Sequence, residues 1–117
     1  MKAAILTEFN RPLAIEDVEP LPPGPRDVVV KIDASGVCHS DLTAATGGIP
    51  IAPPLILGHE GAGTVLEVGP EVTRVRPGDR VVASFIPACG DCFFCLNGQS
   101  NLCELTMTTM LTPHAAR

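Results

Sequence analysis

The chain has 117 residues, enough for one domain with a buried core, and 45% of them are hydrophobic, which excludes a disordered chain. Eight Lys and Arg against 13 Asp and Glu give a net charge of −5 with no basic cluster, which argues against nucleic acid as a partner. No apolar stretch is long enough to span a membrane, and the apolar run at the N-terminus is too short for a signal peptide. We therefore expect a cytoplasmic protein, whose thiols stay reduced and free to bind metal.

Twelve Pro and 11 Gly predict many turns and short strands rather than long helices. Residues 39–46 have room for two turns of helix, which Gly47 and Gly48 would end. Proline lacks an amide donor and fixes φ, so residues 20–25 are expected to form no regular structure and residues 49–54 an extended linker. We expect strands over residues 2–6, 13–18, 27–35, 63–69 and 80–85. Short strands with regular turn signals predict a mainly β domain, a small barrel or sandwich.

Four of the five cysteines lie in one segment, residues 89–103, with the spacing C-x2-C-x2-C-x7-C. A tetrahedral zinc with Zn–S bonds of about 2.3 Å needs sulfurs about 3.8 Å apart. Two intervening residues let a tight turn bring successive thiolates to that separation, and a turn at Asn97-Gly98 lets the chain return to the fourth corner. The spacing therefore predicts a structural zinc held by Cys89, Cys92, Cys95 and Cys103.

Two other uses of these thiols remain as alternatives. An iron–sulfur cluster has the same ligands, although the bacterial ferredoxin run ends C-x3-C-P and Cys103 is followed by Glu104. Disulfides would need an oxidising compartment and would leave one cysteine over.

The fifth cysteine, Cys38, lies in the segment G-V-C-H-S-D, and a G-H-E triplet that contains His59 follows about twenty residues later. A lone cysteine is usually a small core residue, and a lone histidine is usually exposed or hydrogen-bonded. Both residues follow segments expected to be ordered, however, and both have a carboxylate nearby, as the outer partners of metal ligands require. The residue types alone leave the core and the metal-site interpretations open.

These segments together resemble the zinc-dependent alcohol dehydrogenases of the medium-chain dehydrogenase/reductase family. Residues 58–72 read G-H-E-x2-G-x5-G-x2-V, which matches the zinc signature of that family at each defined position. Residues 36–41 are similar to its first catalytic-zinc segment, and residues 89–103 are similar to its structural-zinc loop. The resemblance runs from the first strand to about residue 105, with the motifs in the expected order.

The resemblance implies a GroES-like fold, a partly open β-barrel with short helices and a zinc-binding lobe. Residues 1–105 would be the N-terminal GroES-like portion of a catalytic domain, with the structural-zinc lobe at 89–103, and residues 106–117 a tail. The family's barrel takes further strands from beyond residue 117, so we expect an incomplete barrel. We also expect the nucleotide-binding domain to be absent, because Gly61 and Gly63 start no complete G-x-G-x-x-G fingerprint and suit tight backbone packing instead.

The resemblance also implies roles for the residues around a catalytic zinc. The third ligand in the family is a cysteine beyond residue 117, so the ligand set here is expected to be incomplete. A serine at position 40 is equally well explained as a helix N-cap. Cys38 and His59 would be ligands, Ser40 would hold the substrate oxygen and start a proton relay, Asp41 would fix the His59 tautomer, Glu60 would lie behind the metal, and His39 would lie near the cofactor pyrophosphate.

By this resemblance the protein is an oxidoreductase that transfers hydride between an alcohol or aldehyde and NAD or NADP. The chain alone is expected to be inactive without the cofactor domain, and assembly into a homo-oligomer is left open. One alternative is a non-catalytic zinc-binding structural or assembly module; another is a chaperonin-like barrel, which leaves the Cys and His motifs unexplained. We expect one tightly held zinc per chain, because a second would need a third ligand from Glu60, His114 or another subunit.

The cysteine segment has an unusual charge environment. No Lys or Arg lies between Arg80 and Arg117, although a zinc with four thiolates carries a formal charge of −2. We therefore expect basic groups from elsewhere in the chain, or from a neighbouring subunit, to face it. Its apolar residues, Phe93, Phe94 and Leu96, either form a contact surface or pack back onto the barrel.

Overall fold

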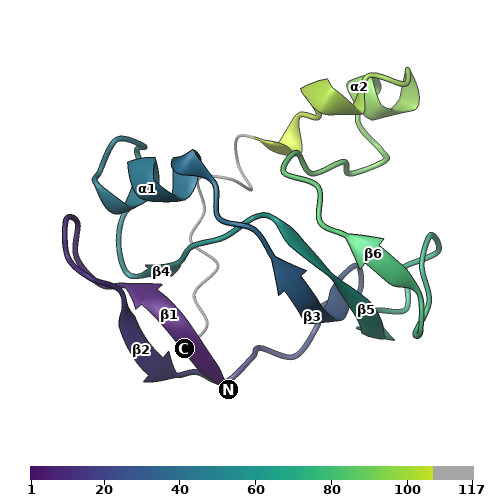
Figure 1. Ribbon diagram of the computed structural model, residues 1–117. Coiled ribbons are helices and arrows are strands. Elements are labelled where there is room, and N and C mark those ends of the chain that lie inside the picture. The colour runs from purple at the N-terminus through teal and green to yellow at the C-terminus, as the bar shows by residue number, and fades with distance from the viewer. Residues whose placement is uncertain (107–117) are drawn as a thin grey trace.

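The computed structural model describes residues 1–106, which form two three-stranded antiparallel sheets and three short helical segments (Figure 1). In the first sheet β1 (Lys2–Leu6) lies between β2 (Ala14–Asp17) and β4 (Leu55–Ile56). The side chain of Leu6 is fully buried, and the Met1 ammonium donates to the carbonyl of Val18 at 2.8 Å. These contacts tie the N-terminus into the sheet.

In the second sheet β5 (Gly61–Val68) lies between β3 (Val28–Ser35) and β6 (Arg80–Val82). The β-branched run of β3 pairs with β5 along nearly its whole length, with two register shifts. At Gly63 the two backbones approach so closely that a Cβ would overlap the Lys31 carbonyl oxygen. The structure thus confirms that Gly63 serves backbone packing, because it lies inside a strand rather than at a nucleotide-binding turn.

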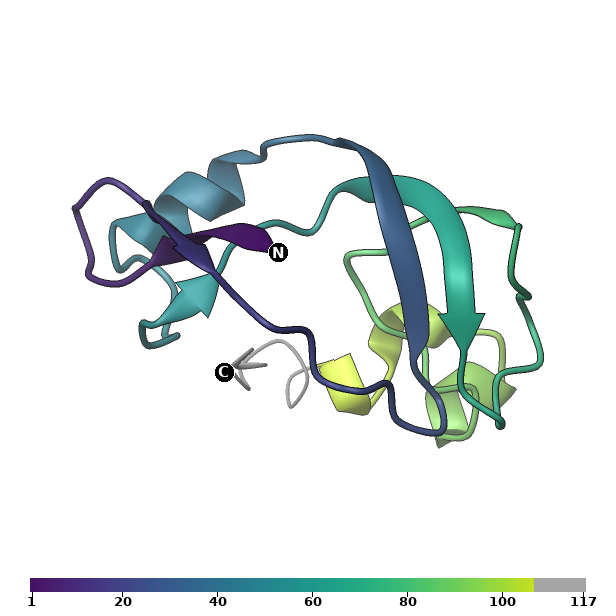
Figure 2. The ribbon, with the colours of Figure 1, turned by 90° about the horizontal axis from the view of Figure 1, so that it is seen from below.

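Helix α1 (His39–Ala45) follows β3 and lies over β4 at the side of the first sheet (Figure 1). It ends as the sequence predicts, because Gly47 adopts a positive φ of 81° immediately after the C-cap residue Thr46. A compact lobe with α2 (Phe93–Leu96) and the 3-10 helix η1 (Ser100–Leu102) follows β6. The segment that joins β2 to β3 crosses from the first sheet to the second (Figure 2), and its Arg26 reaches the lobe through a hydrogen bond to Asp91.

The expectation of a mainly β, partly open fold is confirmed, because the two sheets in the described part of the chain do not close into one barrel. The strand predicted at 63–69 begins two residues earlier, and the one predicted at 80–85 ends at Val82. Strand β4 was not predicted, because its two residues are extended only through their pairing with β1. Apart from Thr106, the predicted tail 106–117 lies outside the described residues.

The buried apolar core is small. Among the described residues it consists of Leu6, Val18, Ala44, Val65 and Cys103. No helix in residues 1–106 is long and apolar enough to cross a membrane.

Candidate metal centres

The first candidate centre lies where α1 begins and β5 begins. Cys38 is the N-cap residue of α1, and His59 and Glu60 come directly before β5. A backbone hydrogen bond of 2.9 Å from the amide of Gly36 to the carbonyl of Glu60 joins the two segments. Motifs about twenty residues apart in the sequence therefore meet at one point.

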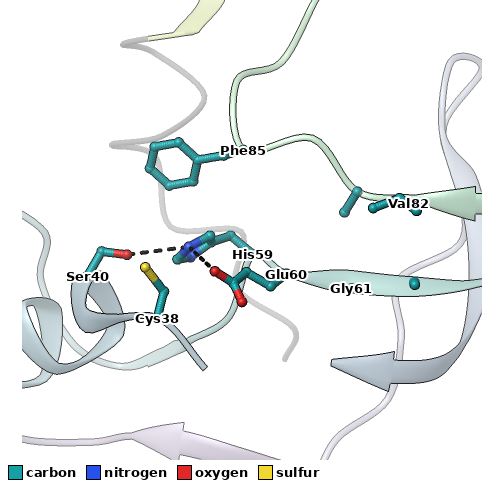
Figure 3. Close-up of a pocket in the computed structure, with 9 residues that line it drawn as sticks. Cys38, Ser40, His59, Glu60, Gly61, Val82 and Phe85 are labelled. Carbon is teal, nitrogen blue, oxygen red and sulfur yellow. Dashed lines mark hydrogen bonds and ion pairs between the residues drawn. The ribbon is translucent and has the colours of Figure 1, made fainter. Parts of the chain in front are cut away.

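Three potential ligand atoms converge there. The Cys38 sulfur, a His59 ring nitrogen and a Glu60 carboxylate oxygen all lie within 4.8 Å of one another. The Ser40 hydroxyl lies 3.4 Å and Glu60 Oε1 lies 4.0 Å from His59 Nε2, and these groups point toward the imidazole in Figure 3. One sulfur, one nitrogen and one oxygen at this spacing suit zinc, so the residues present fit such an ion.

Asp41 connects two of these residues. Its Oδ2 accepts a hydrogen bond of 2.9 Å from the Cys38 amide, and its Oδ1 lies 3.4 Å from His59 Nδ1. The two side chains are largely enclosed, with exposed fractions of 15% for Asp41 and 22% for His59. A carboxylate beside Nδ1 favours a proton on that nitrogen and leaves Nε2 free toward the pocket.

The surroundings of Cys38 favour the ionised form of its thiol. A side-chain hydrogen bond with Ser40, the Ser40 backbone and the His59 side chain lower its pKa, against the opposing effects of desolvation and the Glu60 charge. The thiolate is the form that binds metals, so the surroundings of Cys38 favour the ligand state.

These residues open onto a cavity of about 550 Å³. Its other walls are apolar or small: Gly61, Ala62, Val82, Ala83 and Phe85. The Phe85 ring contacts the His59 ring edge-on, with centroids 4.7 Å apart and an interplanar angle of 63°. The structure does not bring His39 into this cavity; its Nδ1 lies 3.3 Å from the Thr43 hydroxyl on the exposed side of α1.

The second candidate centre is the four-cysteine lobe. The sulfurs of Cys89, Cys92, Cys95 and Cys103 lie within 4.8 Å of one another, and all four thiols are free. Backbone amides of Asp91 and Cys92 donate to the Cys89 sulfur at 3.4 and 3.3 Å. The turns that allow this include Gly90 and Gly98, both with positive φ. The geometry fits a tetrahedral metal with no open position.

Three thiols of the lobe have shifted pKa values, and the shifts differ in direction. Backbone hydrogen bonds, led by that with Glu104, lower the pKa of Cys92 to about 6. A backbone hydrogen bond with Cys89 is the main cause that lowers the pKa of Cys103. The Gly90 backbone lowers the pKa of Cys95, but desolvation and the neighbouring thiols outweigh it and raise the value to about 12. Four thiols this close therefore hold a proton unless a cation replaces it.

The cation expected near the lobe comes from elsewhere in the chain. Arg26 donates from Nη1 to Asp91 Oδ2 at 2.7 Å and from Nη2 to the Cys89 carbonyl at 2.6 Å. The turn that carries Arg26 is fixed by backbone hydrogen bonds from Gly69 and Glu71. Sequence reasoning predicted a cation but not which one, because the partners are more than sixty residues apart.

The apolar residues of the lobe differ in exposure. Phe93 and Leu96 are 66% and 72% exposed, so they lie on the surface. Phe94 is half-buried, and its ring meets that of Phe93 edge-on with centroids 5.5 Å apart.

Comparison with known proteins agrees with this geometry. The alcohol dehydrogenase GroES-like domain family matches residues 24–114. The chain belongs to this family. Alcohol dehydrogenase D of Mycobacterium tuberculosis, whose activity is itself assigned only provisionally, is 47% identical over 108 residues, which cover 92% of this chain and 29% of the relative. The alcohol dehydrogenase of Moraxella sp. is 52% identical over 107 residues, which cover 89% of this chain and 32% of the relative.

A solved structure shares the fold. The alcohol dehydrogenase zinc-binding domain protein from Burkholderia ambifaria superposes with a TM-score of 0.85 at 36% identity, over 92% of this chain and 29% of that one. The chain therefore spans about a third of the length of the relatives that it matches.

Proposed function

We propose that this chain is the N-terminal part of the catalytic domain of a zinc-dependent alcohol dehydrogenase that uses NAD or NADP. The observation that carries the proposal is the convergence of Cys38, His59 and Glu60 on one pocket, with their ligand atoms within 4.8 Å. The names of the curated relatives support the activity, and that of the Burkholderia protein supports the metal. When bound, zinc supplies Lewis-acid stabilisation of an alcohol oxygen.

The residues of the pocket have distinct tasks in this proposal. Cys38, His59 and Glu60 would hold the metal, which would supply Lewis-acid chemistry at this end of the pocket. Asp41 holds the Nδ1 proton of His59, which directs Nε2 to the metal. The Ser40 hydroxyl can donate and accept, so it holds the substrate oxygen and passes on its proton.

The remaining residues near the pocket influence which substrate and cofactor bind. The apolar walls at Val82 and Phe85, although partly exposed themselves, favour the carbon chain of a small alcohol or aldehyde. His39 lies outside the pocket on the exposed first turn of α1, where we propose that it meets the phosphates of the cofactor.

The lobe has a structural task in the same proposal. We propose that residues 1–105 are the GroES-like portion, with a zinc on Cys89, Cys92, Cys95 and Cys103 inside the lobe 89–103. Four sulfurs leave no open position, which is typical of structural zinc. Free thiols suit a reducing cytoplasm, and the exposed Phe93 and Leu96 offer a contact surface for a second subunit.

One experiment separates this function from the alternative, a non-catalytic zinc-binding module, which the complete ligand set of the lobe favours. Cobalt replaces zinc and reports its surroundings in the visible spectrum. With zinc in the lobe and cobalt on Cys38 and His59, we expect a primary alcohol to change the cobalt spectrum, because the open position accepts its oxygen. Cys38→Ser is the control, and a cobalt spectrum indifferent to alcohols would favour the module.

A further inference from the structure

Gly36 lies between β3 and the metal ligand Cys38, directly against Glu60. A Cβ on residue 36 would overlap Glu60 Oε2 and lie 3.2 Å from both Cβ and Cδ of Glu60. Gly36 is not among the residues with positive φ, so its backbone is open to any L-residue. What requires glycine at this position is therefore the side chain of Glu60, not the backbone conformation.

The Glu60 carboxylate has few other constraints. Its side chain is 46% exposed, and its Oε1 lies 4.0 Å from His59 Nε2. A long, half-exposed side chain can rotate away into solvent at little cost. The space over Gly36 is thus what allows the carboxylate to lie beside Cys38 and His59.

We propose that Gly36 is a positioning residue for the metal centre, and that its missing side chain leaves the space in which Glu60 serves as a ligand beside Cys38 and His59. This proposal rests on the metal site of the proposed function. The severe overlap of alanine at position 36 would be with the end of a flexible side chain, so that overlap is relieved by moving the carboxylate out of the pocket rather than by unfolding.

The other tight glycines behave differently. A Cβ at Gly63 or Gly69 would meet backbone carbonyl groups, which cannot move without displacing a strand or turn. At Gly48 it would lie 2.7 Å from Cγ2 of Thr43, at the far end of α1. Among the glycines in residues 1–106, Gly36 is the one whose added Cβ would strike a carboxylate that lines the pocket.

The test is a cobalt titration of the pocket after zinc has filled the lobe, followed by the cobalt–thiolate band of Cys38. We expect Gly36→Ala and Glu60→Ala each to weaken cobalt binding by about 10- to 100-fold, the range usual for loss of a group that supports a metal. The double variant should bind no more weakly than Glu60→Ala, because Gly36 acts through that side chain. Gly48→Ala, a steric change of similar size away from the pocket, should bind as the wild type.

The thermal midpoint of the metal-free chain checks that the effect is local. We expect Gly36→Ala to leave it unchanged; if it falls, the proposal requires that Glu60→Ala in the same chain restores it. Two results would overturn the role of Gly36 while leaving the proposed function in place. One is a wild-type cobalt affinity in Gly36→Ala, and the other is a double variant whose loss of cobalt affinity equals the product of the two single losses. A wild-type chain that binds no cobalt through Cys38 would overturn the proposed function as well.

Discussion

Gly63 links the sequence signature of the family to the packing of the second sheet, and Gly63→Ala tests that link. The added Cβ would overlap the Lys31 carbonyl oxygen and lie 2.8 Å from its carbon and 3.0 Å from the Cα of Ile32. All three atoms belong to the backbone of β3, so relief requires β3 and β5 to separate. A change of side-chain rotamer cannot remove this overlap, because no other side-chain atom takes part in it.

The expected change in the free energy of unfolding follows from two opposing effects. Overpacking costs about 1–3 kcal/mol, and a strained ladder hydrogen bond adds about 1 kcal/mol. Replacing glycine restricts the unfolded chain and returns about 0.4–1 kcal/mol. We therefore expect Gly63→Ala to lower the free energy of unfolding by about 1–3 kcal/mol, which lowers the thermal midpoint by about 4–12 °C in a chain of this size.

The assay is urea and thermal unfolding of the zinc-loaded chain, followed by circular dichroism. Gly61→Ala in the same strand is the matched control, because its Cβ would meet only the end of the Ile32 side chain, at 3.1 Å. We expect this control to change stability by less than about 1 kcal/mol. Equal stability of the two variants would refute the argument that close backbone approach requires Gly63.

Three further predictions concern the two centres and the core. Asp41→Asn should weaken cobalt binding at Cys38 and His59 by about 10-fold or more, because an amide no longer selects the His59 tautomer; an unchanged titration would contradict this. Arg26→Ala should speed zinc transfer from the lobe to a chromophoric chelator, with partial rescue by lysine, whereas equal rates would show that the Asp91 and Cys89 contacts are idle. Leu6→Ala should cost about 2–5 kcal/mol in urea unfolding, but Ile15→Ala, at a 66% exposed position, should cost little; similar losses would place the core elsewhere.

Local sequence signals predicted much of the fold. The β-branched run of β3 and the glycines after α1 determine structure through nearby residues, so they can be read from the sequence. Strand β4 could not be predicted, because its two residues are extended through pairing with β1, some fifty residues away. Strand β6 is shorter than predicted, because its pairing with β5 ends at Val82.

The same distinction holds for the metal centres. The cysteine spacing predicts the lobe, because the thiols converge through local turns. Glu60 was expected behind the metal, and only the contact with Gly36 shows how its carboxylate reaches the other two donors. The roles of Phe85 and Arg26 were not predicted, because each contacts a residue far away in the sequence. Phe85 contacts His59, and Arg26 contacts Asp91.

The most direct test of the account is the zinc content of the purified chain, measured in the wild type and in two cysteine variants. We predict two zinc ions per wild-type chain at saturating metal, and we expect the zinc in the pocket to be held more weakly because fewer protein ligands bind it there. Cys38→Ser should lose that ion and keep the lobe's, and Cys103→Ser should do the reverse. A single zinc per chain that Cys38→Ser leaves in place would contradict a metal centre on Cys38, His59 and Glu60.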